Sequence, residues 1–179
     1  TFRDLTEDIP GIAEKWRKEA ISFDAIYTGY LGSSRQIDLV KQMMDTFLPQ
    51  GGLKIVDPAM ADNGALYTGF DMDFVRKMAK LCATADYILP NLTEACLLTG
   101  TAYHGGLQDE AELKELLKKL GALGAKHVIL KGICFEADKI SNAIYDSASG
   151  ELQCDVTRRV PYSSHGTGDC FAAAFTGAM

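Results

Sequence analysis

The sequence lacks the features that mark membrane proteins and nucleic-acid-binding proteins. No apolar run approaches the roughly 20 residues that a transmembrane helix needs, and no secretory signal peptide is recognisable. Basic residues form no cluster, and 18 Lys and Arg stand against 24 Asp and Glu, for a formal net charge of −6. An acidic chain is repelled by phosphate backbones and by anionic lipids. We therefore expect neither nucleic acid nor a membrane as a partner.

Patterns of metal-ligating and redox-active residues are also missing. The five cysteines are odd in number and scattered, with no Cys-x-x-Cys pair, and the three histidines lie far apart. These spacings argue against a zinc site, and we interpret the cysteines as the reduced thiols of a cytoplasmic protein. No Gly-x-Gly-x-x-Gly turn follows a predicted strand, which argues against a nicotinamide-dependent oxidoreductase.

The composition is that of an ordinary globular domain. The 179 residues have a mass of 19.4 kDa and are 47% hydrophobic, which is enough for one domain with a real core. We therefore treat residues 1–179 as a single domain. Because the chain begins at Thr1 rather than Met and stops at Met179 inside a predicted helix, we expect this domain to be incomplete at both ends.

Apolar patterning predicts strands that alternate with helices through residue 132. Helical spacing of apolar residues appears at 9–20, 35–48, 71–83, 93–99 and 108–121. Short apolar runs that predict strands lie at 23–28, 53–56, 85–89 and 127–130. Two later runs, 139–145 and 151–157, predict a hairpin, and an apolar helix ends the chain. This order indicates an α/β fold with a mostly parallel central sheet, helices on both faces and a late β-hairpin.

A glycine-rich turn precedes the last helix, with Gly166, Thr167, Gly168 and Asp169 in succession. Glycines let a turn aim its N–H groups at one point, and a helix N-terminus adds free N–H groups and a positive partial charge. The pattern predicts an anion site suited to phosphate, which the preceding His165 could also contact. Because phosphate repels a carboxylate, we assign Asp169 to accepting the proton of an attacking hydroxyl. The alternative is a helix cap or first-turn acid.

Polar residues also end the predicted parallel strands, namely Asp57, Asn91 and Lys131. In such sheets ligands bind beyond the carboxyl ends of the strands, so these side chains should meet the glycine turn. Asp57 and Asp62, around the long loop that we expect over 59–70, could together hold Mg²⁺. Otherwise Asp62 is a turn residue. Lys131 is either a phosphate ligand or an ordinary surface lysine.

Two further pairs of side chains lie near the same rim. Asn91 and Glu94 stand three residues apart at a predicted helix start, where Glu94 could take a magnesium-bound water and Asn91 could reach phosphate or metal. The alternative is an Asn cap with a first-turn Glu that the helix dipole favours. Tyr30 and Tyr67 lie in loops and could stack on a flat ligand, or simply pack at the rim.

Four stretches stand in register along the chain: Thr28–Ser33 (TGYLGS), Asp57–Asp62 (DPAMAD), Pro90–Gly100 and Gly166–Asp169. Their residues and order resemble the ribokinase-like superfamily of small-molecule kinases, and within it the pyridoxal (pyridoxine, pyridoxamine) kinases. The likeness extends along essentially all 179 residues. Each motif alone is weak evidence for the family, whereas the four together in this order are specific to it.

The resemblance implies an ATP-dependent kinase that phosphorylates the 5′-hydroxymethyl group of vitamin B6 vitamers. It implies Asp169 as the catalytic base, with the backbone of Gly166–Gly168 as the anion hole. Tyr30 would lie beside the pyridine ring. Mg²⁺ would accompany ATP, held by Asp57 and Glu94 through water, and a monovalent cation and a homodimer are further features of the superfamily. The residues implied to contact ATP are Asp57, Asn91, Glu94 and Lys131.

The chain departs from the family pattern at Ala59, Ala61 and Leu89, where Val, Gly and a small or hydroxylated residue are usual. The nearest alternative is a hydroxymethylpyrimidine kinase of the same superfamily, in which a cysteine commonly replaces Asp169. Asp169 followed by Cys170 favours the B6 kinases. A non-catalytic protein that binds B6 or a nucleotide is the alternative outside the enzymes.

Overall fold

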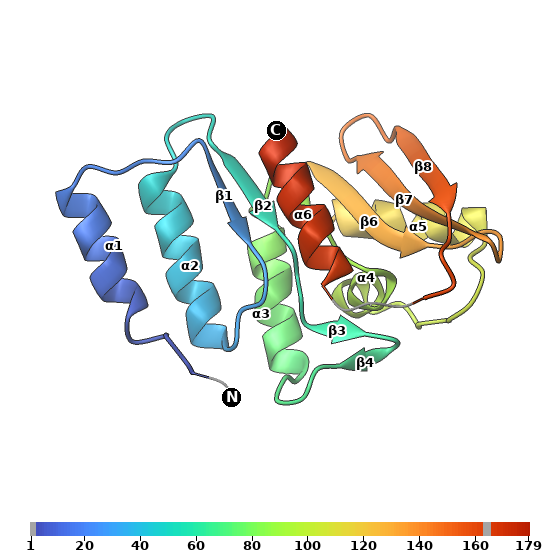
Figure 1. The fold of residues 1–179 in the computed structure, drawn as a ribbon, viewed down its shortest axis with the longest axis horizontal. Helices are drawn as coiled ribbons and strands as arrows, with labels where there is room; N and C mark the ends of the chain where they lie inside the picture. Colours follow the sequence, from blue (N-terminus) through green and yellow to red (C-terminus); the bar gives the residue numbers. More distant parts are fainter. Residues whose placement is uncertain (1–2, 163–165) are drawn as a thin grey trace.

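A mostly parallel sheet organises the computed structural model, which describes residues 3–162 and 166–179. Its six strands follow the order β1-β2-β5-β6-β7-β8 (Figure 1). The parallel strands are β1 (Ala25–Thr28), β2 (Leu53–Val56), β5 (Tyr87–Ile88) and β6 (His127–Ile133). The antiparallel strands are β7 (Lys139–Asp146) and β8 (Leu152–Arg158). The parallel sheet and the late hairpin are confirmed.

Polar caps set the start of most helices. Ser33, Asp71 and Asp109 each accept a hydrogen bond from a first-turn N–H group, which satisfies donors that a helix leaves free. Within the described residues no helix is long and apolar enough to cross a membrane. The helices are α1 (Ile9–Lys18), α2 (Ser34–Phe47), α3 (Met72–Cys82), α4 (Leu92–Thr99), α5 (Glu110–Gly121) and α6 (Thr167–Ala178).

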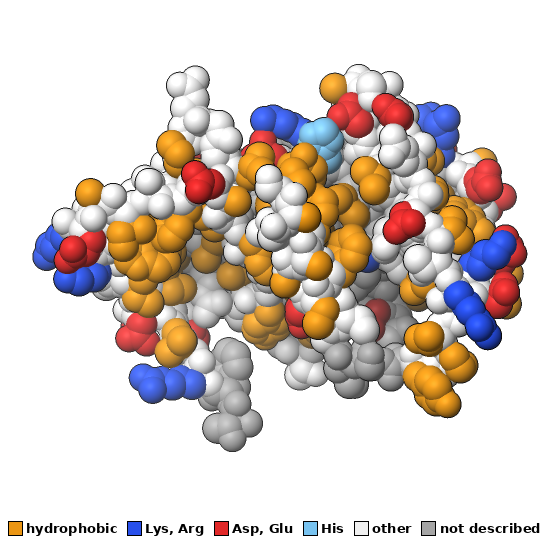
Figure 2. Space-filling view, turned by 45° about the horizontal axis from the view of Figure 1, so that its top comes forward, with side chains coloured by type: hydrophobic (Ala, Val, Ile, Leu, Met, Phe, Trp, Pro, Cys, Tyr) orange, Lys and Arg blue, Asp and Glu red, His pale blue; other side chains and the backbone are white. Residues whose placement is uncertain are grey.

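The two faces of the sheet are covered unequally. Buried side chains of α2, α3, α4 and α5 pack with one face in a large apolar cluster. On the other face Ile55, Leu89 and Ile129 pack with Ala172, Phe171 and Phe175 of α6. Figure 1 shows α6 crossing this second face, and Figure 2 shows hydrophobic side chains still visible around it. Helices on both faces are therefore confirmed, and α6 covers its face by itself among the described residues.

A small hairpin stands where we expected a loop over 59–70. β3 (Ala61–Asp62) and β4 (Ala65–Leu66) pair antiparallel around a turn with left-handed backbone at Asn63 (φ 49°) and Gly64 (φ 81°). An Asn-Gly turn adopts this conformation at low cost. The N–H of Gly64 donates to Thr93 Oγ1 at 3.0 Å, so the hairpin is tied to the start of α4. The loop prediction was wrong over these strands, because two-residue strands have no readable periodicity.

Main-chain hydrogen bonds align the carboxyl ends of the parallel strands. The N–H of Asp57 donates to Thr28 O at 2.8 Å, and the N–H of Lys131 donates to Pro90 O at 2.9 Å. Asn91 and Lys131 form an isolated parallel bridge beyond the end of β5. The ends of β1, β2, β5 and β6 therefore lie along one edge, where the predicted polar residues meet.

Candidate functional site

An ion pair lies at the centre of this edge. Lys131 Nζ is 2.6 Å from Asp57 Oδ2, and only 13% and 4% of the two side chains are exposed. Burial raises the pKa of Asp57 above its ordinary value, although the nearby Lys131 ammonium opposes that rise. Asp57 directly follows the last residue of β2, and Lys131 follows the buried run Val128–Leu130 within β6, so both side chains come to this edge. Lys131 is thus a partner of Asp57 and not an ordinary surface lysine.

The glycine turn stands beside this pair. Gly166 has a left-handed backbone (φ 84°) at the N-cap of α6, and its carbonyl accepts from Cys170 N at 3.0 Å. Within the described residues no side chain caps the helix, so its first N–H groups are free to bind an anion. A methyl group placed on Gly168 would lie 3.7 Å from Lys131 Nζ. The predicted anion turn and the predicted phosphate lysine are therefore adjacent. His165 lies outside the described residues.

Asp169 lies exposed in the first turn of α6. Its negative charge contributes to raising the pKa of Asp57 and of Tyr27. The charge of Asp169 also helps to raise the pKa of Tyr67, although burial and the other carboxylates have larger effects there. Such effects fall off with distance, so Asp169 is close to the ion pair and to both phenols. The structure thus brings together the turn, the lysine and the carboxylate that the sequence predicted separately.

Asn91 and Glu94 form a capping box at the start of α4. Asn91 Oδ1 accepts from Glu94 N at 2.9 Å, and Glu94 Oε2 accepts from Asn91 N at 2.8 Å. Asn91 Nδ2 donates to Ala61 O at 2.8 Å, and Glu94 Oε1 accepts from Met60 N at 3.1 Å. The capping interpretation is confirmed. Any contact of these residues with phosphate or metal is a prediction that the capping geometry does not test.

Glu94 is a buried acid with 2% of its surface exposed. Burial raises its pKa to about 8, the charge of Asp57 adds to that rise, and the hydrogen bonds from Asn91 and Met60 oppose it. Charge repulsion therefore acts between Asp57 and Glu94 and between Asp57 and Asp169, with Lys131 as the nearby positive charge. Carboxylate oxygens are ligands that Mg²⁺ prefers, so this donor set fits the ion. Within the described residues no three acids, histidines or cysteines form a ready-made cage, so Mg²⁺ would need phosphate oxygens as well.

The other predicted side chains lie at the rim. Tyr30 is 53% exposed, and its ring centre is 5.5 Å from that of Phe70. Tyr67 is also exposed, beside the acids named above. Asp62 accepts from Asn63 N at 2.9 Å and Asn63 Nδ2 at 3.0 Å, so its turn role is confirmed.

Sequence reasoning missed two residues of β1. Tyr27 is half-buried, and burial followed by the charges of Asp57 and Asp169 raises its pKa to about 12. Thr28 is buried, and its Oγ1 has no hydrogen-bond partner among the described residues. The alternation of side chains along 23–28 was a usable signal, because it puts Tyr27 and Thr28 on opposite faces at the strand end.

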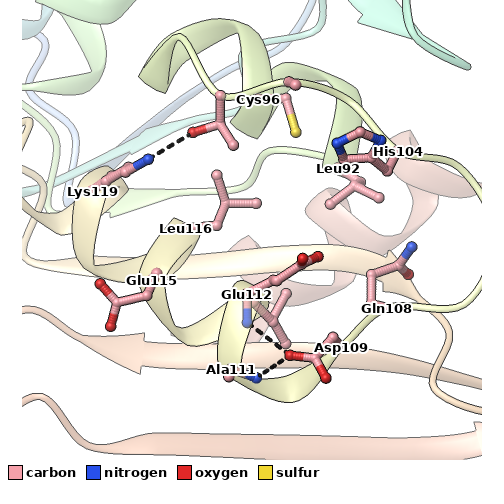
Figure 3. Close-up of a pocket in the computed structure, with 13 residues that line it drawn as sticks. Leu92, Cys96, His104, Gln108, Asp109, Ala111, Glu112, Glu115, Leu116 and Lys119 are labelled. Atoms are coloured by element: carbon pink, nitrogen blue, oxygen red, sulfur yellow. Dashed lines mark hydrogen bonds between the residues drawn. The ribbon is translucent and has the colours of Figure 1, made fainter.

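A pocket with an apolar interior lies elsewhere in the described part of the molecule. A pocket of about 430 Å³ separates α4 from α5, with Leu92, Cys96 and Leu116 inside it (Figure 3). Two of its polar groups already have partners, since Lys119 Nζ donates to Thr101 Oγ1 at 3.2 Å and Asp109 caps α5. Leu92 and Cys96 lie one turn apart on a different side of α4 from Asn91 and Glu94. The pocket is therefore separate from the strand-end site.

Comparison with known proteins identifies the relatives of this chain. Residues 14–179 match the family model of phosphomethylpyrimidine kinase. A hydroxymethylpyrimidine/phosphomethylpyrimidine kinase of Bacillus subtilis (strain 168) is 33% identical over 98% of this chain and 61% of its own length. A crystal structure of a putative phosphomethylpyrimidine kinase from Bacteroides thetaiotaomicron, in a form with pyridoxal, superimposes with a TM-score of 0.91 and 39% identity, covering 99% and 63% of the chains.

A third relative is the pyridoxal kinase of Staphylococcus aureus, in complex with AMP-PCP and pyridoxal. It has a TM-score of 0.73 and 29% identity, and the match covers 92% of this chain and 58% of that one. The chain thus spans about three fifths of the length of these relatives. The resemblance to the ribokinase-like, pyridoxal kinase-like proteins is confirmed, and the chain belongs to the phosphomethylpyrimidine kinase family.

Proposed function

We propose that the protein is an ATP-dependent kinase that phosphorylates the 5′-hydroxymethyl group of a vitamin B6 vitamer. The observation that supports this most is the position of Asp169. It stands in the first turn of a helix that no described side chain caps, and in the neighbourhood of the Asp57–Lys131 pair at the carboxyl edge of the sheet. A base beside an anion site suits proton removal from an alcohol that attacks a phosphoryl group.

In this mechanism the substrate oxygen attacks the γ-phosphorus of ATP, and the bond from that phosphorus to the bridging oxygen of ADP breaks. Asp169 accepts the proton that the alcohol loses. Gly166–Gly168 and the free N–H groups of α6 hold phosphate oxygens, and the Lys131 ammonium adds positive charge beside them. These groups are positioned before the reaction, which is what phosphoryl transfer mainly requires.

Asp57 and Glu94 would hold Mg²⁺ through water when it arrives with ATP. The bound ion would supply charge neutralisation for the phosphate oxygens.

Hydroxymethylpyrimidine is the second candidate substrate. Both candidates are flat heteroaromatic alcohols, so the same base and anion site would serve either. The family match and the B. subtilis relative support the pyrimidine, whereas the complexes of two relatives with pyridoxal support the B6 vitamer. The exposed ring of Tyr30 offers a surface for either heterocycle.

The test is a side-by-side assay of the full-length protein with ATP, Mg²⁺ and each alcohol. Pyridoxal, pyridoxine, pyridoxamine and hydroxymethylpyrimidine would be compared by kcat/KM, with product identified by mass spectrometry. A B6 vitamer with the highest kcat/KM supports the proposal. ATP hydrolysis without a phosphorylated acceptor, or no ATP consumption, would instead indicate a non-catalytic binding protein.

A further inference from the structure

Tyr27 is the side chain of the strand-end site to which no role has yet been given. It pairs with Ile55 in the parallel register of β1 and β2, and its ring packs in the apolar cluster under α6. Side chains alternate between faces along a strand, so Tyr27 shares a face with Ile55 and with the residue two positions beyond, Asp57. The ring is therefore anchored on the α6 side, one strand away from the ion pair.

The hydroxyl of Tyr27 extends past the end of its strand. A methyl group placed on Gly29 would lie only 3.1 Å from the Tyr27 oxygen. Gly29 does not have a left-handed backbone, so its own conformation does not require glycine. What a larger residue would disturb is the phenol, which lies over the glycine at the carboxyl edge of the sheet.

The hydroxyl is also free to bind. It makes no hydrogen bond to another residue in the described part of the chain, although its ring is packed. The charges of Asp57 and Asp169 both raise the pKa of the Tyr27 phenol, after burial. The hydroxyl therefore lies at the carboxyl edge of the sheet, in the neighbourhood of the proposed base and of the Asp57–Lys131 pair.

We propose that Tyr27 is a further catalytic residue, whose hydroxyl donates a hydrogen bond to the phosphoryl group during transfer. This inference rests on the proposed kinase function. The phenol keeps its proton throughout, because its pKa is raised to about 12, and it neither accepts nor gives a proton in the step. A donor that meets charge on the moving group stabilises the transition state more than bound ATP.

The first test compares Tyr27→Phe with Tyr87→Phe in the full-length protein. Both changes remove one phenol oxygen from the same face, but the ring of Tyr87 stacks on His127 at 4.6 Å and lies against Phe175, in the later part of α6. We expect Tyr27→Phe to lower kcat by about 10- to 100-fold, with KM for ATP within about threefold. Tyr87→Phe should leave kcat within about twofold. Equal kcat for both variants and the parent, or a loss that appears only in KM, would overturn the proposal.

A second measurement does not depend on the identity of the acceptor. Binding of ADP with Mg²⁺ and aluminium fluoride, which mimics the transferring phosphoryl group, would be compared with binding of AMP-PCP by calorimetry. We expect Tyr27→Phe to weaken the aluminium fluoride complex about tenfold and to leave AMP-PCP affinity unchanged. Unchanged affinity for both, or equal loss for both, contradicts the role. If the parent protein phosphorylates no alcohol, the kinase proposal fails, and this comparison still decides whether Tyr27 contacts the phosphoryl position.

Discussion

The strand-end site and the α4–α5 pocket differ in what they contain: the pocket has an enclosed volume, and the site has charged groups and hydrogen-bond donors. The pocket encloses about 430 Å³ and has an apolar interior, yet its lysine and its capping aspartate already have partners. The strand-end site instead gathers three carboxylates, a largely buried lysine and a helix N-terminus that no described side chain caps. The function that we propose uses the region where carboxylates and unoccupied N–H donors gather among the described residues, and it does not use the α4–α5 pocket.

The physical reason lies in how each region is built. The pocket lies between two helices that bury leucines, so its surface is what helix packing leaves over. The site lies at the carboxyl edge of four parallel strands. The polar residues there follow buried apolar residues in the chain, so they are partly buried themselves. Groups held that way have shifted pKa values, which is typical of functional sites. Four changes would test or refine this contrast, from the largest expected effect to the smallest.

Replacing Asp169 with Asn should have the largest effect. The amide cannot accept the proton of the alcohol, so we expect kcat to fall by about 10²- to 10⁴-fold. Affinity for ATP should persist, because Asp169 is exposed and no phosphate contact depends on it. Kinetics and calorimetry would be compared with Asp155→Asn, an exposed carboxylate on β8 that should behave like the parent. Unchanged turnover in Asp169→Asn would remove this residue from the mechanism.

Replacing Lys131 with Met should affect both activity and stability. The change leaves Asp57 buried without its partner, which costs about 3 kcal/mol of unfolding free energy in pairs of this kind. Urea unfolding would measure the loss. The double variant Lys131→Met, Asp57→Asn removes both charges, so we expect it to regain most of the stability but none of the ATP affinity. A single variant as stable as the parent would mean that the pair is not effectively buried.

The pKa of Glu94 should make stability depend on pH in the ligand-free protein. Its folded pKa is about 8 against a reference value of 4.5, so between these values the unfolded chain releases a proton that the folded chain keeps. Stability therefore falls as pH rises, by up to about 1.4 kcal/mol per pH unit, and the effect ends above pH 8. Relative to Glu94→Gln, the parent should lose stability from pH 5 to pH 8. An exposed control, Glu112→Gln, should follow the parent, and parallel curves for all three would contradict the prediction.

Filling the α4–α5 pocket should have the smallest effect. Ala102 is exposed at its mouth, so Ala102→Phe can occupy the hollow without breaking a described hydrogen bond. We expect kcat and KM within about twofold of the parent, and a melting temperature within a few degrees. A large fall in kcat would show that the pocket affects the strand-end site, and would contradict the view that the two regions are separate.

Much of the fold was readable in the sequence. The strand predicted at 53–56 has those bounds, and the helix predicted at 71–83 runs over 72–82, because both have clear apolar periods. β6 continues three residues past the predicted end at Leu130. Gly132, with φ 70°, allows an irregular pairing with β7 between Leu130 and Ile133 that an apolar pattern cannot reveal.

The sequence predicted which residues form the candidate site, but it did not predict which of them contact one another. The ends of apolar runs identified Asp57, Asn91 and Lys131, and the glycine turn identified Asp169. The sequence left two interpretations open for Lys131 and for Glu94, and it overlooked Tyr27. Each of these depends on neighbours from other elements, which a linear pattern does not contain.

The sequence by itself determined where strands end and which polar residues follow them, because apolar periodicity and glycine turns act over a few residues. Only the tertiary structure decided that Lys131 pairs with Asp57, 74 residues away, and that the buried Glu94 accepts a hydrogen bond from Met60 N. Ion pairing and burial depend on distances between elements that the sheet brings together. The acidity of these groups, and with it the proposed chemistry, is therefore a property of the folded chain.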